Sequence, residues 1–344
     1  MRVRRSATVA ALLVLCLAAS FGRAVAARDS PQHGIQVLWY DNPAESDNAV
    51  RDQVARIVDY VAGMGANALA ISFPFFTPGL HANDVSAAGP TPAPQRLRLL
   101  VDGATKRGLR VMLRPLLDEG SLTPGWRGSI EPENRNQWFS SLERFLEPYL
   151  RMANKARVTS FSLGSELSSM ERDPHWADVV RLARSLFSGE LSYSAHWDRL
   201  LSAVEMPVDS IGVDTYFPLG TLSDDATVEE IKAGWNTWLD KLLTHPSVAR
   251  VPIHEVGIAA QKGAYAHPWA QTHDPVDFEV QRRWYAAVCA VVRERDMRGV
   301  YFWALDFHQD LTSNSPDVGS PFSFVNRPAE KEIRACFDAG SATS

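Results

Sequence analysis

Two glutamates stand directly after short apolar segments, where an acidic side chain needs a partner or a chemical role. Glu166 follows residues 160–165 (SFSLGS), and Glu255 follows residues 251–254 (VPIH). Acids are almost never fully buried without a partner. Glycoside cleavage needs two carboxyl groups, one to protonate the leaving oxygen and one to attack the anomeric carbon. The pair predicts a glycosidase in which Glu166 and Glu255 divide these two roles between them, and a retaining enzyme would hold the two carboxyl groups about 5–5.5 Å apart.

Five further side chains stand at or near the ends of apolar segments and are candidates for substrate binding: Trp39, Arg114, His196, Tyr216 and Trp303. The indoles of Trp39 and Trp303 offer a flat surface for the apolar face of a sugar ring. The phenol of Tyr216 is placed to hydrogen-bond and orient the nucleophile. Arg114 is expected either to bind substrate or to set the pKa of a carboxylate.

Neighbours of these candidates allow simpler interpretations. Asp214, two residues before Tyr216, is expected to be an inward-pointing structural acid. His254 precedes Glu255, and strand alternation points it to the opposite face, so it is expected to be structural. Asp118 and Glu119 follow an apolar segment and are either ligands of sugar hydroxyls or ordinary loop acids.

Other reaction classes lack their sequence signals. The histidines show no HExxH spacing or other tight metal-ligand spacing, which disfavours a metal-dependent deacetylase. No G-x-S-x-G motif is present, which disfavours a Ser-His-Asp hydrolase. We therefore expect no metal and no cofactor.

The elements that would position these residues alternate regularly along the chain. Eight apolar, β-branched segments are candidate strands: 34–40, 66–73, 109–115, 159–164, 191–196, 210–216, 251–256 and 299–305. Amphipathic segments lie between them: 49–64, 95–107, 135–154, 176–187, 227–243 and 276–295. Strands of nearly continuous apolar character are typical of parallel sheets covered on both faces. The pattern predicts an α/β fold, a single-domain (β/α)8 TIM barrel. A doubly wound open sheet is the competing arrangement, but no glycine-rich phosphate loop supports it.

The first 26 residues have the pattern of a signal peptide. Arg2, Arg4 and Arg5 precede an apolar stretch over 7–21, and 24–26 (AVA) has the small-x-small form of a cleavage site. We expect residues 1–26 to be removed, leaving a catalytic domain over 27–344 that is secreted or periplasmic. Lipidation at Cys16 is the lesser alternative.

Charge and cysteine content narrow the partners. The net charge is −5, and removal of four arginines with the leader would make it −9. An acidic protein is a poor partner for nucleic acid or an anionic membrane, whereas neutral sugars are compatible with this charge without being selected by it. We expect a monomer that acts on a polysaccharide or oligosaccharide. Cys289 and Cys336 either form one disulfide or remain two thiols.

Taken in order, the motifs of the chain resemble glycoside hydrolase family 113, a group of retaining β-mannanases with (β/α)8 barrels. The resemblance covers roughly residues 34–306. It is carried by 111–115 (VMLRP), 126–128 (WRG), 138–139 (WF), 161–167 (FSLGSEL), 212–219 (GVDTYFPL), 254–257 (HEVG), 268–269 (PW) and 299–303 (GVYFW).

The resemblance implies cleavage of internal β-1,4 bonds in mannan-type polysaccharides, without a cofactor. It implies a retaining enzyme with Glu166 as general acid/base and Glu255 as nucleophile. It also implies substrate-facing roles for Trp126, Arg127, Tyr216 and Trp303. The chain departs from the common pattern at Leu116, Ser165 and His254, where His, Asn and Thr are more usual. The alternatives are therefore a non-catalytic carbohydrate-binding barrel, and a hydrolase or transglycosylase acting on another β-glycan.

Overall fold

The computed structural model describes residues 31–199, 206–242 and 251–341, and within them eight parallel strands close into a barrel. Neighbouring strands pair in chain order, and β8 pairs with β1. The predicted (β/α)8 barrel is confirmed, and the open-sheet alternative is wrong. The predicted signal peptide, with Cys16, lies outside the described residues.

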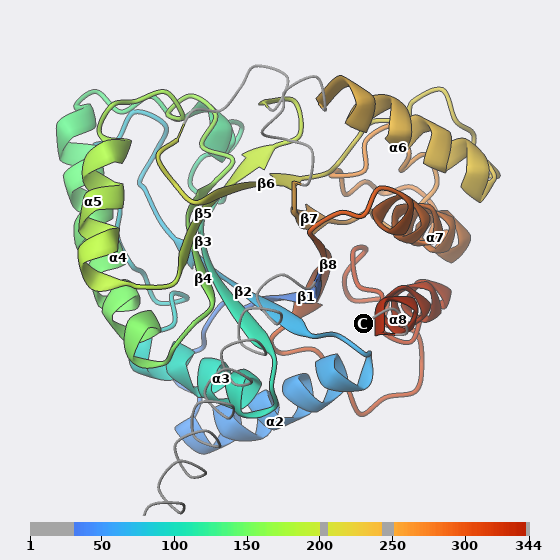
Figure 1. Cartoon of the computed structure of the whole chain (residues 1–344), viewed down its shortest axis with the longest axis horizontal. Coiled ribbons are helices and arrows are strands. Elements are labelled where there is room, and N and C mark those ends of the chain that lie inside the picture. The colour runs from blue at the N-terminus through green and yellow to red at the C-terminus, as the bar shows by residue number, and fades with distance from the viewer. Residues whose placement is uncertain (1–30, 200–205, 243–250, 342–344) are drawn as a thin grey trace, which may run out of the picture.

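The strands surround the barrel axis and the helices form an outer ring (Figure 1). The strands are β1 (Gln32–Leu38), β2 (Ala68–Phe75), β3 (Arg110–Leu117), β4 (Ser160–Ser165), β5 (Glu190–His196), β6 (Ser210–Asp214), β7 (Ile253–Val256) and β8 (Gly299–Asp306). The helices are α2 (Asp47–Gly63), α3 (Pro94–Lys106), α4 (Arg135–Lys155), α5 (Trp176–Leu186), α6 (Val228–Leu242), α7 (Phe278–Glu294) and α8 (Pro328–Ser341). Helix α8 was not among the predicted amphipathic segments.

Local sequence signals explain where helices begin and which face they bury. The Ser46 side chain accepts a hydrogen bond from the Ala49 amide at the start of α2, and Asp277 caps α7 in the same way. The apolar residues of α2 recur at helical spacing, so one stripe packs against the barrel. Its buried apolar residues are Val50, Val54, Ile57, Val58 and Val61.

The barrel interior divides into an apolar layer and a polar layer. Ala68, Ala70, Met112 and Tyr301 form a small apolar cluster of their own, separate from the large core. One inward position further toward the carboxyl ends of the strands, the buried side chains are polar: Gln36, Ser72, Arg114, Ser194 and Asp214. Side chains alternate between the two faces of a strand, so this polar layer is the floor on which the functional face is built.

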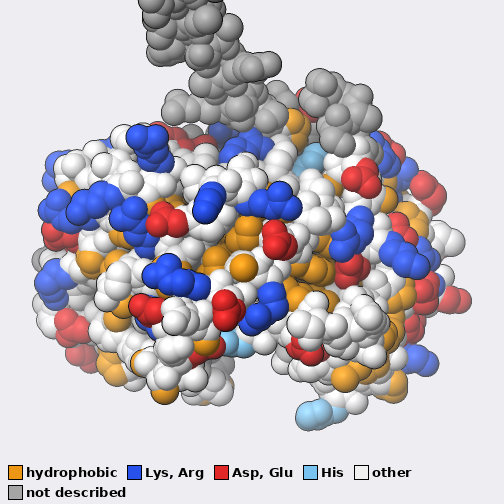
Figure 2. Space-filling model, turned by 90° about the horizontal axis from the view of Figure 1, so that it is seen from below, with side chains coloured by type: hydrophobic (Ala, Val, Ile, Leu, Met, Phe, Trp, Pro, Cys, Tyr) orange, Lys and Arg blue, Asp and Glu red, His pale blue; other side chains and the backbone are white. Residues whose placement is uncertain are grey.

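The outer surface mixes charges of both signs. On the face over α2 and α3, basic and acidic side chains are interspersed (Figure 2). Arg98 pairs there with Asp102, and Arg107 with Asp59. Among the described helices, none is long and apolar enough to cross a membrane.

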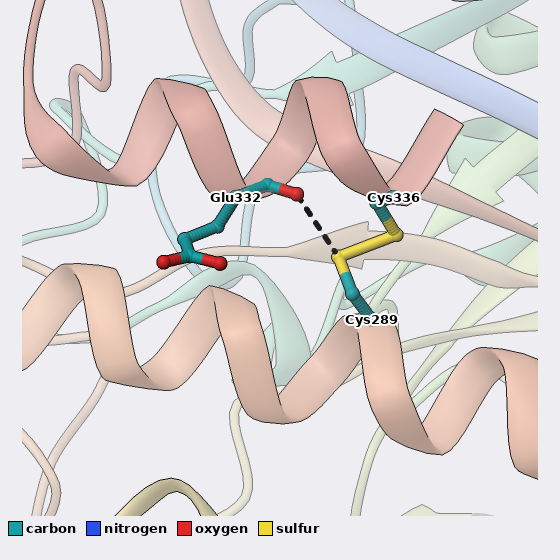
Figure 3. The surroundings of a disulfide bond; sticks show 3 residues. All are labelled: Cys289, Glu332 and Cys336. Atoms are coloured by element: carbon teal, nitrogen blue, oxygen red, sulfur yellow. Dashed lines mark hydrogen bonds between the residues drawn. A yellow bond between two sulfur atoms is a disulfide. The ribbon is translucent and has the colours of Figure 1, made fainter. Parts of the chain in front are cut away.

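One disulfide joins the last two helices. Cys289 of α7 and Cys336 of α8 are bonded, with their Cα atoms 5.4 Å apart (Figure 3). The Sγ atom of Cys289 also lies 3.8 Å from the carbonyl oxygen of Glu332. Of the two states considered for these cysteines, the structure has the disulfide.

Candidate active site

Glu166 stands immediately after β4, at the carboxyl end of the strand. Its backbone has a φ of 54°, in the left-handed region that non-glycine residues rarely adopt. Its amide donates a 2.8 Å hydrogen bond to the carbonyl oxygen of Ser194 on β5. An unusual backbone conformation held by the neighbouring strand fixes where this carboxyl group projects.

The environment of Glu166 suits a group that must hold a proton. Its side chain is only 13% exposed. The Nη1 atom of Arg127 lies 3.6 Å from Oε2, and the Nε2 atom of His196 lies 4.0 Å from Oε1. Burial raises the pKa of the Glu166 carboxyl, although Arg127 and His196 oppose that rise. Within the described residues, no donor makes a hydrogen bond of normal length to this carboxylate.

Glu255, on β7, is held quite differently. The Tyr216 hydroxyl donates to its Oε1 atom, and Nη1 of Arg114 donates to Oε2. The Nε2 atom of Gln36 lies 3.4 Å from the same Oε2. Three donors from three strands or strand ends therefore hold this carboxylate in one orientation. Two acids in such unlike environments are the arrangement expected of a proton donor and a nucleophile.

A β-bulge on β7 explains why His254 and Glu255 both reach the barrel interior. The pairing of β6 with β7 passes from Val213 and Ile253 directly to Asp214 and Glu255, so β7 carries one extra residue, His254. The prediction that His254 points to the opposite face from Glu255 is therefore wrong.

His254 packs within the polar layer. Its Nδ1 atom lies 2.9 Å from Oγ of Ser194, and its ring covers Gly212, where any Cβ would overlap it. Burial lowers the pKa of His254 to about 3, with the charge of Arg114 adding to the effect. The ring is therefore neutral at ordinary pH and belongs to the support of the site.

Arg114 lies at the centre of the polar layer and is fully buried. Besides Glu255, its guanidinium donates from Nη2 to Asp214, and Nη1 lies 3.1 Å from Oε1 of Gln36. Its Nε donates to Oγ of Ser194 at 3.3 Å. Of the two roles predicted for Arg114, this position favours setting the charge of carboxylates over direct contact with substrate.

The remaining candidates, with one exception, lie around the two glutamates. The Trp126 indole is 36% exposed, and its ring centre is 5.1 Å from that of His196. Trp303 is partly exposed and lies next to Tyr216 across Gly257. A Cβ at Gly257 would stand 3.1 Å from the Tyr216 hydroxyl and 3.2 Å from the Trp303 ring. The glycine therefore allows both side chains to lie close to the backbone at this position.

Trp39 is the exception, and its predicted place beside the substrate needs correction. Its side chain is fully buried and stacks on Phe307, with ring centres 4.0 Å apart. Trp39 has the same parity along the chain as Ile35 and Val37, which point outward from β1 into the core beneath the helices. The neighbouring Tyr40 is 39% exposed instead.

Two tryptophans that were not among the predicted site residues extend this face. An aromatic row continues from Trp126 and His196 to Trp197 and Trp269, and Trp269 is 46% exposed. The ring centres of His196 and Trp197 are 5.3 Å apart, and those of Trp197 and Trp269 are 6.4 Å apart. The position of Trp197 directly after a strand end was the available signal.

Glu119 also gains a place in the site. It lies 3.0 Å from Nε of Arg127 and so competes with Glu166 for the same guanidinium. Burial raises the pKa of nearby Tyr40 to about 12, and the charge of Asp118 contributes to that rise. The loop acids at 118–119 thus lie on the same face as the two glutamates. Over the described ranges, no group of three His, Cys, Asp or Glu side chains is placed to hold a metal ion.

A (β/α)8 barrel with two acids in contrasting environments at the ends of β4 and β7 is typical of the glycoside hydrolases. The comparison with protein families makes this specific: the chain belongs to Glycoside Hydrolase Family 113, whose model matches residues 44–318. The chain is accordingly an O-glycosyl hydrolase.

Solved structures agree on the fold. A GH113 β-1,4-mannanase superposes with a TM-score of 0.76 at 16% identity, covering 90% of this chain and 99% of that one. The GH113 β-mannanase AaManA from Alicyclobacillus acidocaldarius, in complex with ManMIm, gives 0.75 at 19% identity, with 90% and 98% covered. The exo-β-1,4-mannosidase Op5Man5 from Opitutaceae bacterium strain TAV5 gives 0.57 at 13% identity, with 91% and 60% covered. No curated protein matches the chain significantly.

Proposed function

We propose that this chain is a secreted endo-β-1,4-mannanase that cleaves its substrate with retention of anomeric configuration. The observation that carries the proposal is the contrast between the two acids. Glu255 is fixed by three donors, whereas burial raises the pKa of Glu166, which lacks such donors. Such a contrast assigns one carboxyl group to attack and the other to proton transfer.

In the first step, a Glu255 oxygen attacks the anomeric carbon while protonated Glu166 gives its proton to the departing glycosidic oxygen. The glycosidic C–O bond breaks, and an ester bond joins the sugar to Glu255. Tyr216 and Arg114 hold the attacking carboxylate in place, which removes the need to order it during the reaction.

In the second step, Glu166 is a carboxylate and takes a proton from water, which attacks the same carbon. The ester bond to Glu255 breaks, and both acids return to their starting states. The nearby charge of Arg127, 3.6 Å from Glu166, stabilises the ionised form needed as base.

Mannan as substrate is supported by family membership and by the names of the similar structures, which include β-1,4-mannanases. The aromatic row supports a chain substrate, because exposed indoles offer flat apolar surfaces to successive sugar rings. Secretion is supported by the basic and apolar pattern of residues 1–26.

The test is hydrolysis of a polysaccharide panel by the chain without residues 1–26. The panel contains mannan, glucomannan, galactan, xylan and β-glucan. We expect oligosaccharides from mannan and glucomannan, loss of that activity in Glu255→Ala, and full activity in Glu147→Gln, a partly exposed acid on α4 that serves as control. Proton NMR during early turnover should show the β-anomer first. First release of the α-anomer would contradict retention. Sugar binding without any hydrolysis would favour the carbohydrate-binding barrel.

A further inference from the structure

We propose that Asp214 is a second counter-charge for Arg114, which moderates the pull of Arg114 on the nucleophile and balances its charge once the nucleophile is esterified. The inference rests on the proposed function, because it takes Glu255 to be the nucleophile. Asp214 touches Arg114 rather than the reacting atoms, so it is a positioning residue.

The geometry that carries this inference is one guanidinium shared by two carboxylates. Asp214 and Glu255 are paired residues on adjacent strands β6 and β7. Arg114 arrives from β3 and donates Nη2 to Asp214 and Nη1 to Glu255. The side chains of Arg114 and Asp214 are both 0% exposed, while that of Glu255 is 10% exposed. Only one of the two carboxylates therefore has access to substrate.

Apart from Arg114, no side chain among the described residues makes a hydrogen bond or an ion pair with Asp214. Its Oδ1 atom is buried and has no hydrogen-bond partner among the described residues. A buried carboxylate with one oxygen unpaired destabilises the folded state, so Asp214 would be destabilising if its role were only structural. That destabilisation is explained if the negative charge of Asp214 is needed in one state of the reaction.

The charge balance around Arg114 changes as the reaction proceeds. Burial raises the pKa of Asp214, and the charge of Arg114 opposes that rise. With both acids ionised in the free enzyme, two carboxylates surround one guanidinium. When Glu255 bonds to the anomeric carbon, its negative charge disappears and the proton of Glu166 leaves with the aglycone. Arg114 then has Asp214 as its ion-pair partner. Without Asp214, the ester would leave a buried guanidinium with no opposite charge in direct contact, which is strongly unfavourable.

This reasoning predicts opposite effects on the two chemical steps. In Asp214→Asn, Arg114 acts on Glu255 alone, so the carboxylate is more stable and attacks more slowly. The same stabilisation makes Glu255 a better leaving group from the ester. We expect glycosylation to slow by roughly tenfold or more, and deglycosylation to stay equal or accelerate. A variant that merely disturbs the site would slow both steps.

The experiment uses 2,4-dinitrophenyl β-mannobioside, whose good leaving group makes deglycosylation rate-limiting, so the wild-type enzyme should release a burst of dinitrophenol. In Asp214→Asn, glycosylation becomes the slow step, so the burst should vanish and kcat/KM should fall. The fall in kcat should be accounted for by the slower glycosylation alone. Asp209→Asn is the matched control, because this acid precedes β6 at the opposite end of the strand and pairs with Arg184. It should keep the burst.

The outcomes distinguish a failure of the role proposed for Asp214 from a failure of the proposed function. A retained burst with equal loss in both steps would overturn the role of Asp214 and leave the proposed function intact. A wild-type enzyme inert on both this substrate and mannan would overturn the proposed function and this inference with it. If Asp214→Asn does not fold, wild-type enzyme trapped with a 2-fluoro mannosyl fluoride provides the test. Arg114 should remain bonded to Asp214 in its crystal structure, and a guanidinium turned away from Asp214 would refute the proposal.

Discussion

The proposed proton-donor role of Glu166 makes a quantitative prediction about its neighbour Arg127. The positive charge of Arg127, 3.6 Å from Oε2 of Glu166, favours the ionised carboxylate. Replacing Arg127 with Met removes that charge, so the pKa of Glu166 should rise. Since the proposed first step requires protonated Glu166, the alkaline limb of kcat/KM should move to higher pH.

The size of the shift follows from the distance. Two unit charges 3.6 Å apart interact by about 1 kcal/mol in water and about 5 kcal/mol at an effective dielectric constant of ~20. Arg127 and Glu166 are partly exposed, at 17% and 13%, and Glu119 takes part of the Arg127 charge at 3.0 Å. We therefore expect a value near the lower limit, about one pH unit, since one pKa unit corresponds to about 1.4 kcal/mol.

A companion variant should move the alkaline limb of kcat/KM in the opposite direction, to lower pH. Glu119→Gln leaves Arg127 with Glu166 as its nearest carboxylate, so the pKa of Glu166 should fall and the alkaline limb should shift to lower pH. The assay is the pH dependence of kcat/KM on glucomannan oligosaccharides, with Arg151→Met on α4 as a control for loss of a surface charge. Alkaline limbs that coincide in all four proteins would refute the assignment of that limb to Glu166.

Three further predictions concern the nucleophile, the aromatic row and the disulfide. Tyr216→Phe removes a hydrogen bond to Glu255, so kcat/KM should fall by about 10- to 100-fold in a variant that stays folded at the assay temperature; a fall below threefold would contradict the orienting role. Trp269→Ala should raise KM for mannan several-fold and leave an aryl mannobioside unaffected, whereas Val276→Ala, also exposed, should change neither. Reduction of the disulfide should lower the free energy of unfolding by about 4 kcal/mol in urea titrations, because the disulfide closes a loop of 47 residues. A fully reduced chain with an unchanged urea midpoint would refute this.

The fold could be predicted because each strand carries its own signal. Strands buried on both faces are apolar almost throughout, and eight of them alternating with amphipathic segments leave few arrangements open. Helix α8 escaped notice because its sequence (PAEKEIRACFDAGS) has few large apolar residues beyond Ile333 and Phe337.

The site was predictable at strand ends and less so inside the barrel. Trp39 was misplaced although its parity with Ile35 and Val37 was visible in the sequence. His254 was misplaced for a different reason, because a bulge cancels the alternation on which the prediction relied. The bond between Arg114 and Asp214 joins residues 100 positions apart, and it depends on barrel closure rather than on any local pattern.

The disulfide changes the covalent topology of the barrel as well as its stability. Strands β1 and β8 close the ring, and they are the one neighbouring pair that the chain does not join in sequence. The cross-link between Cys289 and Cys336 makes residues 289–336 a covalent loop, and all of β8 lies inside it. The strand that closes the barrel therefore lies within a covalently closed loop of chain. An exopeptidase trimming from the carboxyl terminus would meet this loop before it could release β8.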